Sequence, residues 1–405
     1  MKKTSSKFVN DQDVRFTLEA ELILNIGRAI CYGQKEGIQP LLKKGSFNWD
    51  LFKEMLVYHE LNPFAYLILK DYFLFLPEGL IKALEPTYYF YLHQAVYLQQ
   101  KFLDLFQVFK EKKIAFIPIK GIGILEDLYY KFPIRPMVDI DVLIKKEDLA
   151  PVVFTLEQQG FKKDLEGLKE AYWKEKQYHL IFSKQELGKS AFVIEVHWDI
   201  DYPRGKSNLM PEMFNRLREF SIQNEPVELL STEDTFLVLA IHQRHFGKTL
   251  ALKYTCDMVL LLNKYTLNFD WNYILRKSKE NNLCSTVFFA LNQIKLIFNT
   301  NIPLPILEEL NVSSWKKNKI KIFILTNTFL SDQNSKCKNV YLKAHFLLYD
   351  DWWEPISYLL NIPQEQFAKF YNLAPYDRKT GFLYRLRLFY IFFKTILKNK
   401  ETKSK

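Results

Sequence analysis

Several residue types are scarce in this chain of 405 residues, and each shortage excludes a class of protein. There are only 13 Gly, so the chain has few tight turns for its length, which favours long helices over a many-stranded β architecture. The four Cys stand at positions 31, 256, 284 and 337. No two of them form a Cys-x-x-Cys pair, which excludes a zinc knuckle and a disulfide framework and makes a reducing cytoplasm the expected compartment.

Long uninterrupted apolar runs are also missing. A membrane-spanning helix needs about 18 consecutive apolar residues, and the nearest approach, residues 386–393, is interrupted by Arg387. The surrounding stretch 382–397 is consistent with a buried terminal helix or with a basic amphipathic helix on a membrane surface. The basic N-terminus is followed by Asn10 and Asp11 rather than by an apolar signal core. We therefore expect a cytoplasmic protein with no transmembrane segment and no secretory signal.

Aromatic and basic residues are abundant instead. The 34 Phe, 23 Tyr and 7 Trp make up 16% of the chain, more than one core needs, so some rings are expected to line a groove or to pack helices together. The formal net charge is +10, and a positive surface attracts anions such as nucleotides, RNA or an acidic membrane face. With 48% apolar and 25% charged residues, the chain has the composition of a globular protein, and its 405 residues are enough for two or three packed units.

The spacing of apolar residues divides the chain into three regions. Helical periodicity runs through residues 14–105, with starts at Asn48 and near Pro86, and returns after the N-cap signature that begins at Ser231. Between these regions, strands are expected at 114–119, 137–144, 179–182 and 193–198, with a helix over 145–159 that Gly160 ends. We therefore predict an α+β fold, in which a small mixed sheet (106–225) is flanked by an N-terminal (1–105) and a C-terminal (226–405) helical region.

Two aspartates alternate along the strand expected at 137–144. Because alternate side chains of a strand share a face, Asp139 and Asp141 are expected to point the same way. Neighbouring carboxylates repel each other and favour a cation between them, and their oxygens suit Mg²⁺. A solvated strand face is the plain alternative for so short a motif. A second Asp-x-Asp, Asp199 and Asp201, lies at a strand exit where a turn is expected, and we rank it below the first.

The residues around these aspartates strengthen the interpretation. A buried strand ends in Lys120-Gly121 and opens a helix, and a helix N-terminus with a Gly turn offers free amides to phosphates. Arg135 precedes the aspartate strand and could instead pair locally with Glu126 or Asp127.

A later apolar strand carries Glu195 and His197 on one face. A lone Glu inside such a strand is costly unless it is paired or bound to a metal. Carboxylates on two neighbouring strands beside a phosphate-binding turn predict a metal-dependent phosphoryl-transfer site.

The segment 119–144 resembles the nucleotidyltransferases of the DNA polymerase beta-like superfamily. It contains, in this order, Lys120-Gly121, Leu128-Tyr129, Arg135 and Asp139-Ile140-Asp141. More narrowly, they resemble a poorly characterised bacterial nucleotidyltransferase family, in which a Glu-x-His-Trp strand follows, as Glu195-Val196-His197-Trp198 does here. Spaced histidines and a later Asp match His242, His245 and Asp257. The resemblance covers about residues 106–260. The superfamily usually has Gly-Ser at the phosphate turn, where this chain has no Ser, and the gap from Gly121 to Asp139 is longer than in the minimal enzymes.

The resemblance implies a small nucleotidyltransferase core and an enzyme that moves a nucleoside monophosphate from an NTP to a hydroxyl acceptor and releases pyrophosphate. It implies Mg²⁺, or Mn²⁺ in its place, held by Asp139 and Asp141. The third carboxylate, Glu195, binds a second metal ion or takes the proton of the attacking hydroxyl, and these three are the catalytic residues. The nucleotide contacts are then Lys120, Gly121, Arg135, His197, His242 and His245. The acceptor stays open among a small molecule, a tRNA and a protein, and the sequence indicates no oligomeric state.

A catalytically inactive nucleotide- or RNA-binding module, acting as a regulatory or antitoxin-like partner, is the alternative. The missing Ser favours it, and the intact carboxylates oppose it. Lys253 and Asp257 stand at i and i+4 on a predicted helix, and we expect them to form a structural salt bridge.

Overall fold

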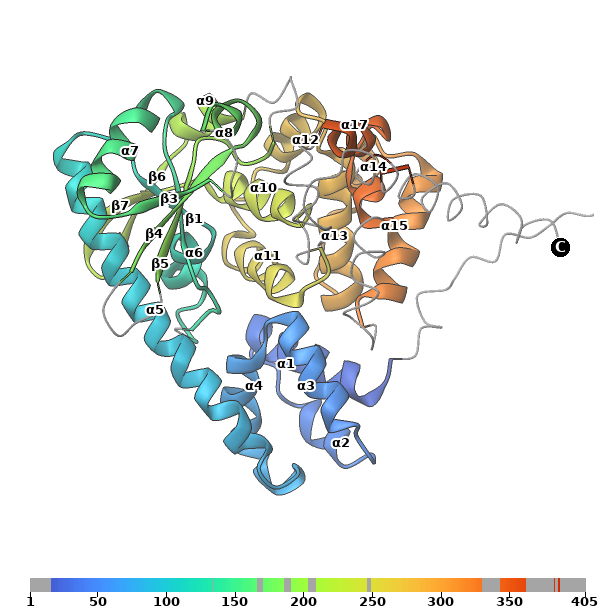
Figure 1. Cartoon of the computed structure of the whole chain (residues 1–405). Coiled ribbons are helices and arrows are strands. Elements are labelled where there is room, and N and C mark those ends of the chain that lie inside the picture. Colours follow the sequence, from blue (N-terminus) through green and yellow to red (C-terminus); the bar gives the residue numbers. More distant parts are fainter. Residues whose placement is uncertain are drawn as a thin grey trace, which may run out of the picture.

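The computed structural model describes residues 16–132, 134–165, 170–185, 191–202, 209–245, 249–329 and 343–361, together with Phe382, Arg385 and Leu386. The N-terminal start, Cys337 and nearly all of the stretch 382–397 lie outside the described residues. Within them, none of the helices combines the length and the apolar character that crossing a membrane requires. The predicted α+β fold is confirmed: a five-stranded mixed sheet lies between helices that precede and follow it in the chain (Figure 1).

The N-terminal region is helical, as predicted. Its elements are α1 (Leu18–Tyr32), α2 (Ile38–Leu42), α3 (Trp49–His59), α4 (Asn62–Leu69), the 3-10 helix η1 (Lys70–Phe75) and α5 (Leu80–Glu111). The side chain of Asn48 accepts a hydrogen bond from the Leu51 amide and caps α3. Helix α5 starts earlier than the predicted Pro86, because Leu80 and Leu84 are buried and extend its packed face. In Figure 1, α5 runs from the N-terminal helices to the sheet.

The sheet has the strand order β1-β2-β5-β4-β3. The strands are β1 (Ile117–Ile119), β2 (Ile140–Leu143), β3 (Lys162–Asp164), β4 (His179–Lys184) and β5 (Phe192–His197). Only the central pair, β2 and β5, is parallel, and the other three pairs are antiparallel. Helices α6 (Lys120–Leu128), α7 (Leu149–Gln158, after the 3-10 turn η2, Lys146–Asp148) and α8 (Glu170–Lys176) connect the first four strands.

The predicted strand at 137–144 is shorter in the structure, and this affects the site. The pairing of β2 with β1 begins at Asp141, and its pairing with β5 begins at Ile140. Asp139 therefore lies just before the strand, in a bend. The reason is that β1 ends at Ile119, where α6 begins, so that no neighbour on that side continues the ladder.

Two strand regions carry no clear signal in the sequence. The edge strand β3 lies in a Lys/Glu-rich stretch, because an edge strand can keep polar side chains in water. The hairpin β6 (Arg218–Ile222) and β7 (Glu225–Leu229) follows α9 (Met210–Asn215). Its two-residue turn, Gln223 and Asn224, has φ of 48° and 67°, the geometry that suits a tight hairpin. This hairpin crosses the expected domain boundary at 225/226.

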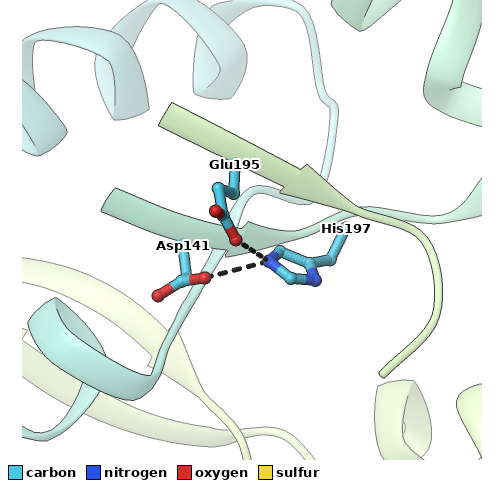
Figure 2. A group of neighbouring side chains, drawn as sticks. All are labelled: Asp141, Glu195 and His197. Carbon is cyan, nitrogen blue, oxygen red and sulfur yellow. Dashed lines mark hydrogen bonds and ion pairs between the residues drawn. The ribbon is translucent and has the colours of Figure 1, made fainter. Parts of the chain in front are cut away.

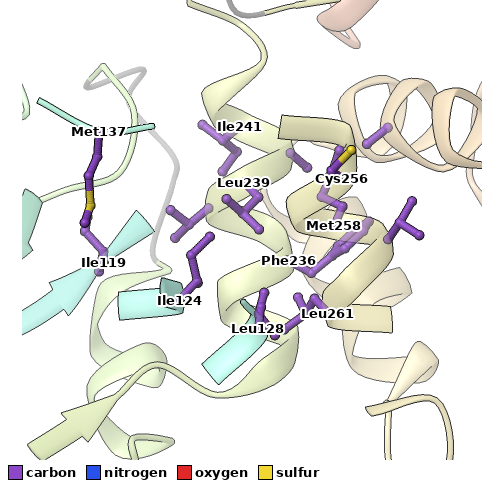
Figure 3. Packing of buried hydrophobic residues seen from close by; sticks show 14 of the residues in the cluster. Ile119, Ile124, Leu128, Met137, Phe236, Leu239, Ile241, Cys256, Met258 and Leu261 are labelled. Atoms are coloured by element: carbon purple, nitrogen blue, oxygen red, sulfur yellow. The ribbon is translucent and has the colours of Figure 1, made fainter. Parts of the chain in front are cut away.

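The C-terminal region is helical to the end of the described residues. It contains α10 (Thr232–His242), α11 (Leu252–Tyr265), α12 (Trp271–Glu280), α13 (Cys284–Phe298), α14 (Leu304–Glu309), α15 (Ser314–Asn327) and α17 (Trp353–Asn361). The predicted N-cap is confirmed, since Ser231 Oγ accepts a hydrogen bond from the Asp234 amide. Figure 3 shows how Ile124 and Leu128 of α6 pack with Leu239 of α10 and Leu261 of α11. This apolar contact fixes α6, which begins at Lys120, against the C-terminal helices.

Candidate functional site

A cavity of about 260 Å³ lies where the three predicted regions meet. Glu60 and Tyr91 reach it from the N-terminal helices, and Lys253 and Tyr254 reach it from α11. Its charged lining consists of four carboxylates and three cations: Glu60, Asp139, Asp141 and Glu195, with Lys120, Arg135 and Lys253. Every residue predicted from the sequence for the site lines this cavity except His197, which lies behind it in contact with Asp141.

Asp141, Glu195 and His197 form the centre of the site (Figure 2). Asp141 and Glu195 are directly paired across the parallel strands β2 and β5, so their side chains leave the sheet on the same face. His197 Nε2 lies 2.9 Å from Asp141 Oδ1 and 3.3 Å from Glu195 Oε2. One potential ligand atom from each of the three lies within 4.8 Å of the others. The face shared by Glu195 and His197 was predicted, whereas the contact of His197 with Asp141 requires the tertiary pairing.

Lys120 neutralises part of this negative charge. Its Nζ lies 2.5 Å from Asp141 Oδ1, with side chains only 11% and 9% exposed. Burial raises the pKa of Asp141, but Lys120 and His197 outweigh it and hold that pKa well below its usual range. Burial lowers the pKa of Lys120, yet Asp141 and Glu195 raise it above the ordinary value. The pair is therefore ionised, and the ammonium lies on the carboxylate rather than free in the cavity.

Asp139 lines the cavity but lies outside the group of three close ligand atoms. Burial, followed by the charges of Asp141 and Glu195, raises the pKa of Asp139 to about 6. A carboxylate that resists ionisation beside two others marks a region where negative charge is in excess.

The turn at Lys120-Gly121 is tightly packed. Lys120 has φ of 50°, in the left-handed region that a residue with a side chain rarely adopts. A Cβ on Gly121 would lie 3.1 Å from Met137 Sδ and 3.7 Å from Arg135 Nη1. A Cβ on Gly123 would lie 2.5 Å from the Pro118 carbonyl oxygen. Both glycines thus let the first turn of α6 approach its neighbours closely, with the helix N-terminus at the cavity.

Arg135 is held by a distant acid, and not by Glu126 or Asp127 as the local alternative supposed. Its Nε and Nη2 donate hydrogen bonds to the two carboxylate oxygens of Asp257 at 2.8 and 2.6 Å. Tyr129 donates a third at 2.5 Å. All three side chains are buried. The remaining nitrogen, Nη1, faces Gly121. The bonds to Asp257 therefore fix the direction of the guanidinium group, and Arg135 still lines the cavity.

Lys253 makes a different ion pair from the one predicted. Its ammonium bonds Glu60 and donates to the Pro136 carbonyl oxygen at 3.1 Å, and Asp257 is committed to Arg135. The predicted Lys253–Asp257 salt bridge is therefore wrong, because each residue finds its partner in another part of the chain. Burial, followed by the charge of Arg135, lowers the pKa of Lys253 to about 8. Tyr254 also donates to Glu60, at 3.1 Å.

Aromatic and imidazole rings form the rest of the lining. His242 and His245 both line the cavity, with ring centroids 5.1 Å apart. Helix α10 ends at His242, so His245 lies in the following turn, where its Nε2 is 3.3 Å from the Tyr178 hydroxyl. His179 stacks on His197 at 5.0 Å. Burial, followed by the charges of His197 and Lys120, holds the pKa of His179 well below its ordinary value, so that ring is neutral.

The second Asp-x-Asp has a structural role. Asp201 accepts a 2.6 Å hydrogen bond from Arg244, and both side chains are buried. The Asp199 carboxylate accepts the Ile200 amide at 2.7 Å. These bonds hold the predicted turn at the exit of β5.

Six polar lining residues were not identified from the sequence: Glu60, Tyr91, Tyr178, His179, Lys253 and Tyr254. Glu60 is the C-cap of α3 and Tyr91 lies in α5, both before the sheet in the chain, so no local pattern ties them to the site. His179 opens the strand predicted at 179–182, but only the pairing of β4 with β5 places it opposite His197.

Comparison with known proteins gives a family match. A family model described as uncharacterised nucleotidyltransferase matches residues 45–299. The match includes the whole sheet, the cavity-lining residues and part of each helical region. No curated protein matches the chain.

Proposed function

Because this chain belongs to a family of uncharacterised nucleotidyltransferases, we propose that it is a metal-dependent enzyme that transfers a nucleoside monophosphate from an NTP to a hydroxyl acceptor. The observation that carries the proposal is the direct pairing of Asp141 with Glu195 across two parallel strands, beside the N-terminus of α6. Carboxylates and a helix N-terminus facing one cavity suit a cation and phosphates together.

The side chains fit a divalent cation. Asp141 and Glu195 offer carboxylate oxygens and His197 an imidazole nitrogen, all within 4.8 Å of one another. Asp139 lies on the same cavity wall and is a further oxygen donor. Carboxylates suit Mg²⁺, and an added imidazole is well accepted by Mn²⁺. When bound, the cation would supply charge neutralisation to the phosphates of the NTP.

The turn at Lys120-Gly121 is the proposed phosphate contact. The first amides of α6 have no partner within the helix, and the helix dipole adds partial positive charge there. Arg135 Nη1 lies beside this turn and is aimed by the bidentate bond to Asp257. The rings of His242 and His245 border the same space and offer hydrogen-bonding contacts to the nucleotide.

Glu195 is the proposed acceptor of the proton. The hydroxyl oxygen of the acceptor attacks the α-phosphorus, the bond to the bridging oxygen of the β-phosphate breaks, and pyrophosphate leaves. The proton of the hydroxyl moves to the Glu195 carboxylate, which is only partly buried and lines the cavity. Arg135 and Lys120 offset the charge that develops on the leaving pyrophosphate. The acceptor itself is a small molecule, a tRNA or a protein hydroxyl.

A catalytically inactive nucleotide- or RNA-binding module is the second candidate. It is favoured by the ion pair of Lys120 with Asp141, which already neutralises one carboxylate, and by the absence of a Ser at the phosphate turn. A module of this kind needs no metal at Asp141 and Glu195.

A nucleotide titration separates the two candidates. Each of the four NTPs is titrated with and without Mg²⁺ or Mn²⁺ into the wild type and the Asp139→Ala/Asp141→Ala variant. Metal-dependent binding of one NTP that the variant loses supports the enzyme. Binding that ignores both metal and variant supports a nucleotide-binding module, and no binding under any condition rejects the enzyme and leaves only the RNA-binding form of the module.

A further inference from the structure

The position of the Lys120 ammonium has a consequence for cation binding. Its Nζ lies 2.5 Å from Asp141 Oδ1, the same oxygen that His197 Nε2 contacts at 2.9 Å. Asp141 and His197 are two of the three residues that place potential ligand atoms within 4.8 Å of one another. An ammonium and a divalent cation would therefore compete for the same carboxylate.

The Lys120 side chain is held at this place by its position in the fold and by its burial. It is the first residue of α6, and its φ of 50° is a left-handed conformation that costs a non-glycine residue energy. The side chain is only 11% exposed, and Asp139 and Glu195 line the same cavity. A buried ammonium of this kind is stable only while an anion faces it.

We propose that Lys120 is an internal cation that holds the carboxylate site together in the metal-free protein, and that it is displaced from Asp141 to the phosphates when a divalent cation and an NTP bind together. The inference rests on the proposed function and deepens it. It gives one side chain two successive anionic partners, Asp141 first and the triphosphate second.

Cooperativity follows from this exchange. A metal ion that binds alone must separate Lys120 from Asp141 and leave a buried ammonium without a partner, which is costly. An NTP provides the new partner, so the metal binds more tightly when the nucleotide is present. By thermodynamic linkage, the metal raises the affinity for the nucleotide by the same factor. Removal of the ammonium removes both the competition and the coupling.

Binding of Mn²⁺, followed by electron paramagnetic resonance without nucleotide, tests the proposal on the full chain. Lys120→Met is compared with the wild type and with Lys253→Met. Lys253 is a matched control, because it is another buried ammonium in the same cavity but is paired with Glu60. We expect Lys120→Met to bind Mn²⁺ about tenfold more tightly than the wild type, and Lys253→Met to change the affinity far less. An α,β-methylene NTP analogue should tighten Mn²⁺ binding by the wild type and have little such effect on Lys120→Met.

Two results would overturn the proposal. One is Mn²⁺ affinity in Lys120→Met that equals that of the wild type, which would make Lys120 a fixed structural partner. The other is an equal gain in Lys120→Met and Lys253→Met, which would reflect only the loss of cavity charge. Lys120→Gln provides a second variant, and thermal melts followed by circular dichroism show that each protein is folded. If the wild type binds no NTP, the proposed function fails, whereas tighter Mn²⁺ binding by Lys120→Met alone still supports the internal cation.

Discussion

The two charged walls of the cavity are built in opposite ways. On the cationic wall, Arg135 pairs with Asp257 and Lys253 pairs with Glu60, so each cation has its own anion. On the carboxylate wall, the described residues contain one direct ion pair between a lysine and the acids Asp139, Asp141 and Glu195, namely that of Lys120 with Asp141. The difference indicates that the charges of the cationic wall are fully paired, whereas the carboxylate wall keeps negative charge in excess. A bound cation would reduce the repulsion between these carboxylates.

The largest expected effect belongs to the carboxylate wall. Glu195→Gln keeps the shape of the side chain but removes the charge and the proposed proton acceptor, and we expect nucleotidyl transfer to fall on the order of 1000-fold. Steady-state release of pyrophosphate measures it. Glu147→Gln, at an exposed position just after β2, is the control and should keep its rate. Unchanged turnover in Glu195→Gln would remove this residue from the mechanism.

The next effect tests the cationic wall. Asp257→Asn leaves the Arg135 guanidinium, which is 4% exposed, without a counter-charge, and we expect the free energy of unfolding to drop by about 3 kcal/mol. Urea denaturation measures this loss. The double variant Arg135→Gln/Asp257→Asn should lose less than the two single variants combined, because no charge is then left unpaired. Additive losses would show that the two residues do not act as a pair.

A third prediction concerns the pH dependence on the carboxylate wall. Because the pKa of Asp139 is raised to about 6 from an ordinary 3.8, the folded protein holds this proton more tightly than the unfolded chain. Wild-type stability therefore falls as the pH rises from about 4 to about 6, and the loss persists above that range.

Asp139→Asn lacks this penalty. It should exceed the wild type in stability by about 2 kcal/mol at pH 7, allowing for the water that reaches the side chain, and should show no advantage at pH 4. Urea denaturation at several pH values, in a metal-free buffer, measures the difference. The exposed Asp104→Asn should show no such pH-dependent gain. A constant difference between Asp139→Asn and wild type across this range would contradict the raised pKa.

The smallest effect concerns the contribution of the N-terminal helices. Glu60→Gln weakens the hold on Lys253 and Tyr254, and we expect stability to fall by about 1 kcal/mol, because Lys253 keeps its bond to the Pro136 carbonyl. Thermal or urea unfolding measures the change. Glu54→Gln, exposed on α3, is the matched control. A loss of stability as large as that of Asp257→Asn would mean that the two ion pairs of the cationic wall contribute equally to the free energy of unfolding.

Several features of the site could be predicted from the sequence because they depend on local pattern. Alternation in β5 places Glu195 and His197 on one face, and the glycines after Lys120 indicate a close turn. Local spacing also predicted a salt bridge between Lys253 and Asp257, and that prediction was wrong. Helical spacing shows that two residues can meet, but it cannot show that a stronger partner lies elsewhere.

Alternation placed Asp139 within the predicted strand, whereas the structure places it in a bend just before β2. Its place one pleat from Asp141 holds only if the strand extends that far, and the length of β2 is set by the neighbours β1 and β5. The hairpin β6–β7 was likewise not seen, because its alternation is weak and its turn of Gln223 and Asn224 contains no glycine.

The sequence by itself determined the order of helical and mixed regions, the turn that opens α6 and the face shared by Glu195 and His197. These follow from periodicity and from the chemistry of each side chain. Only the tertiary structure decided the partners. Arg135 meets Asp257 across 122 positions, and Lys253 meets Glu60 across 193. Such pairs are chosen by the packing of whole helices against the sheet, and that packing depends on contacts between all parts of the chain at once.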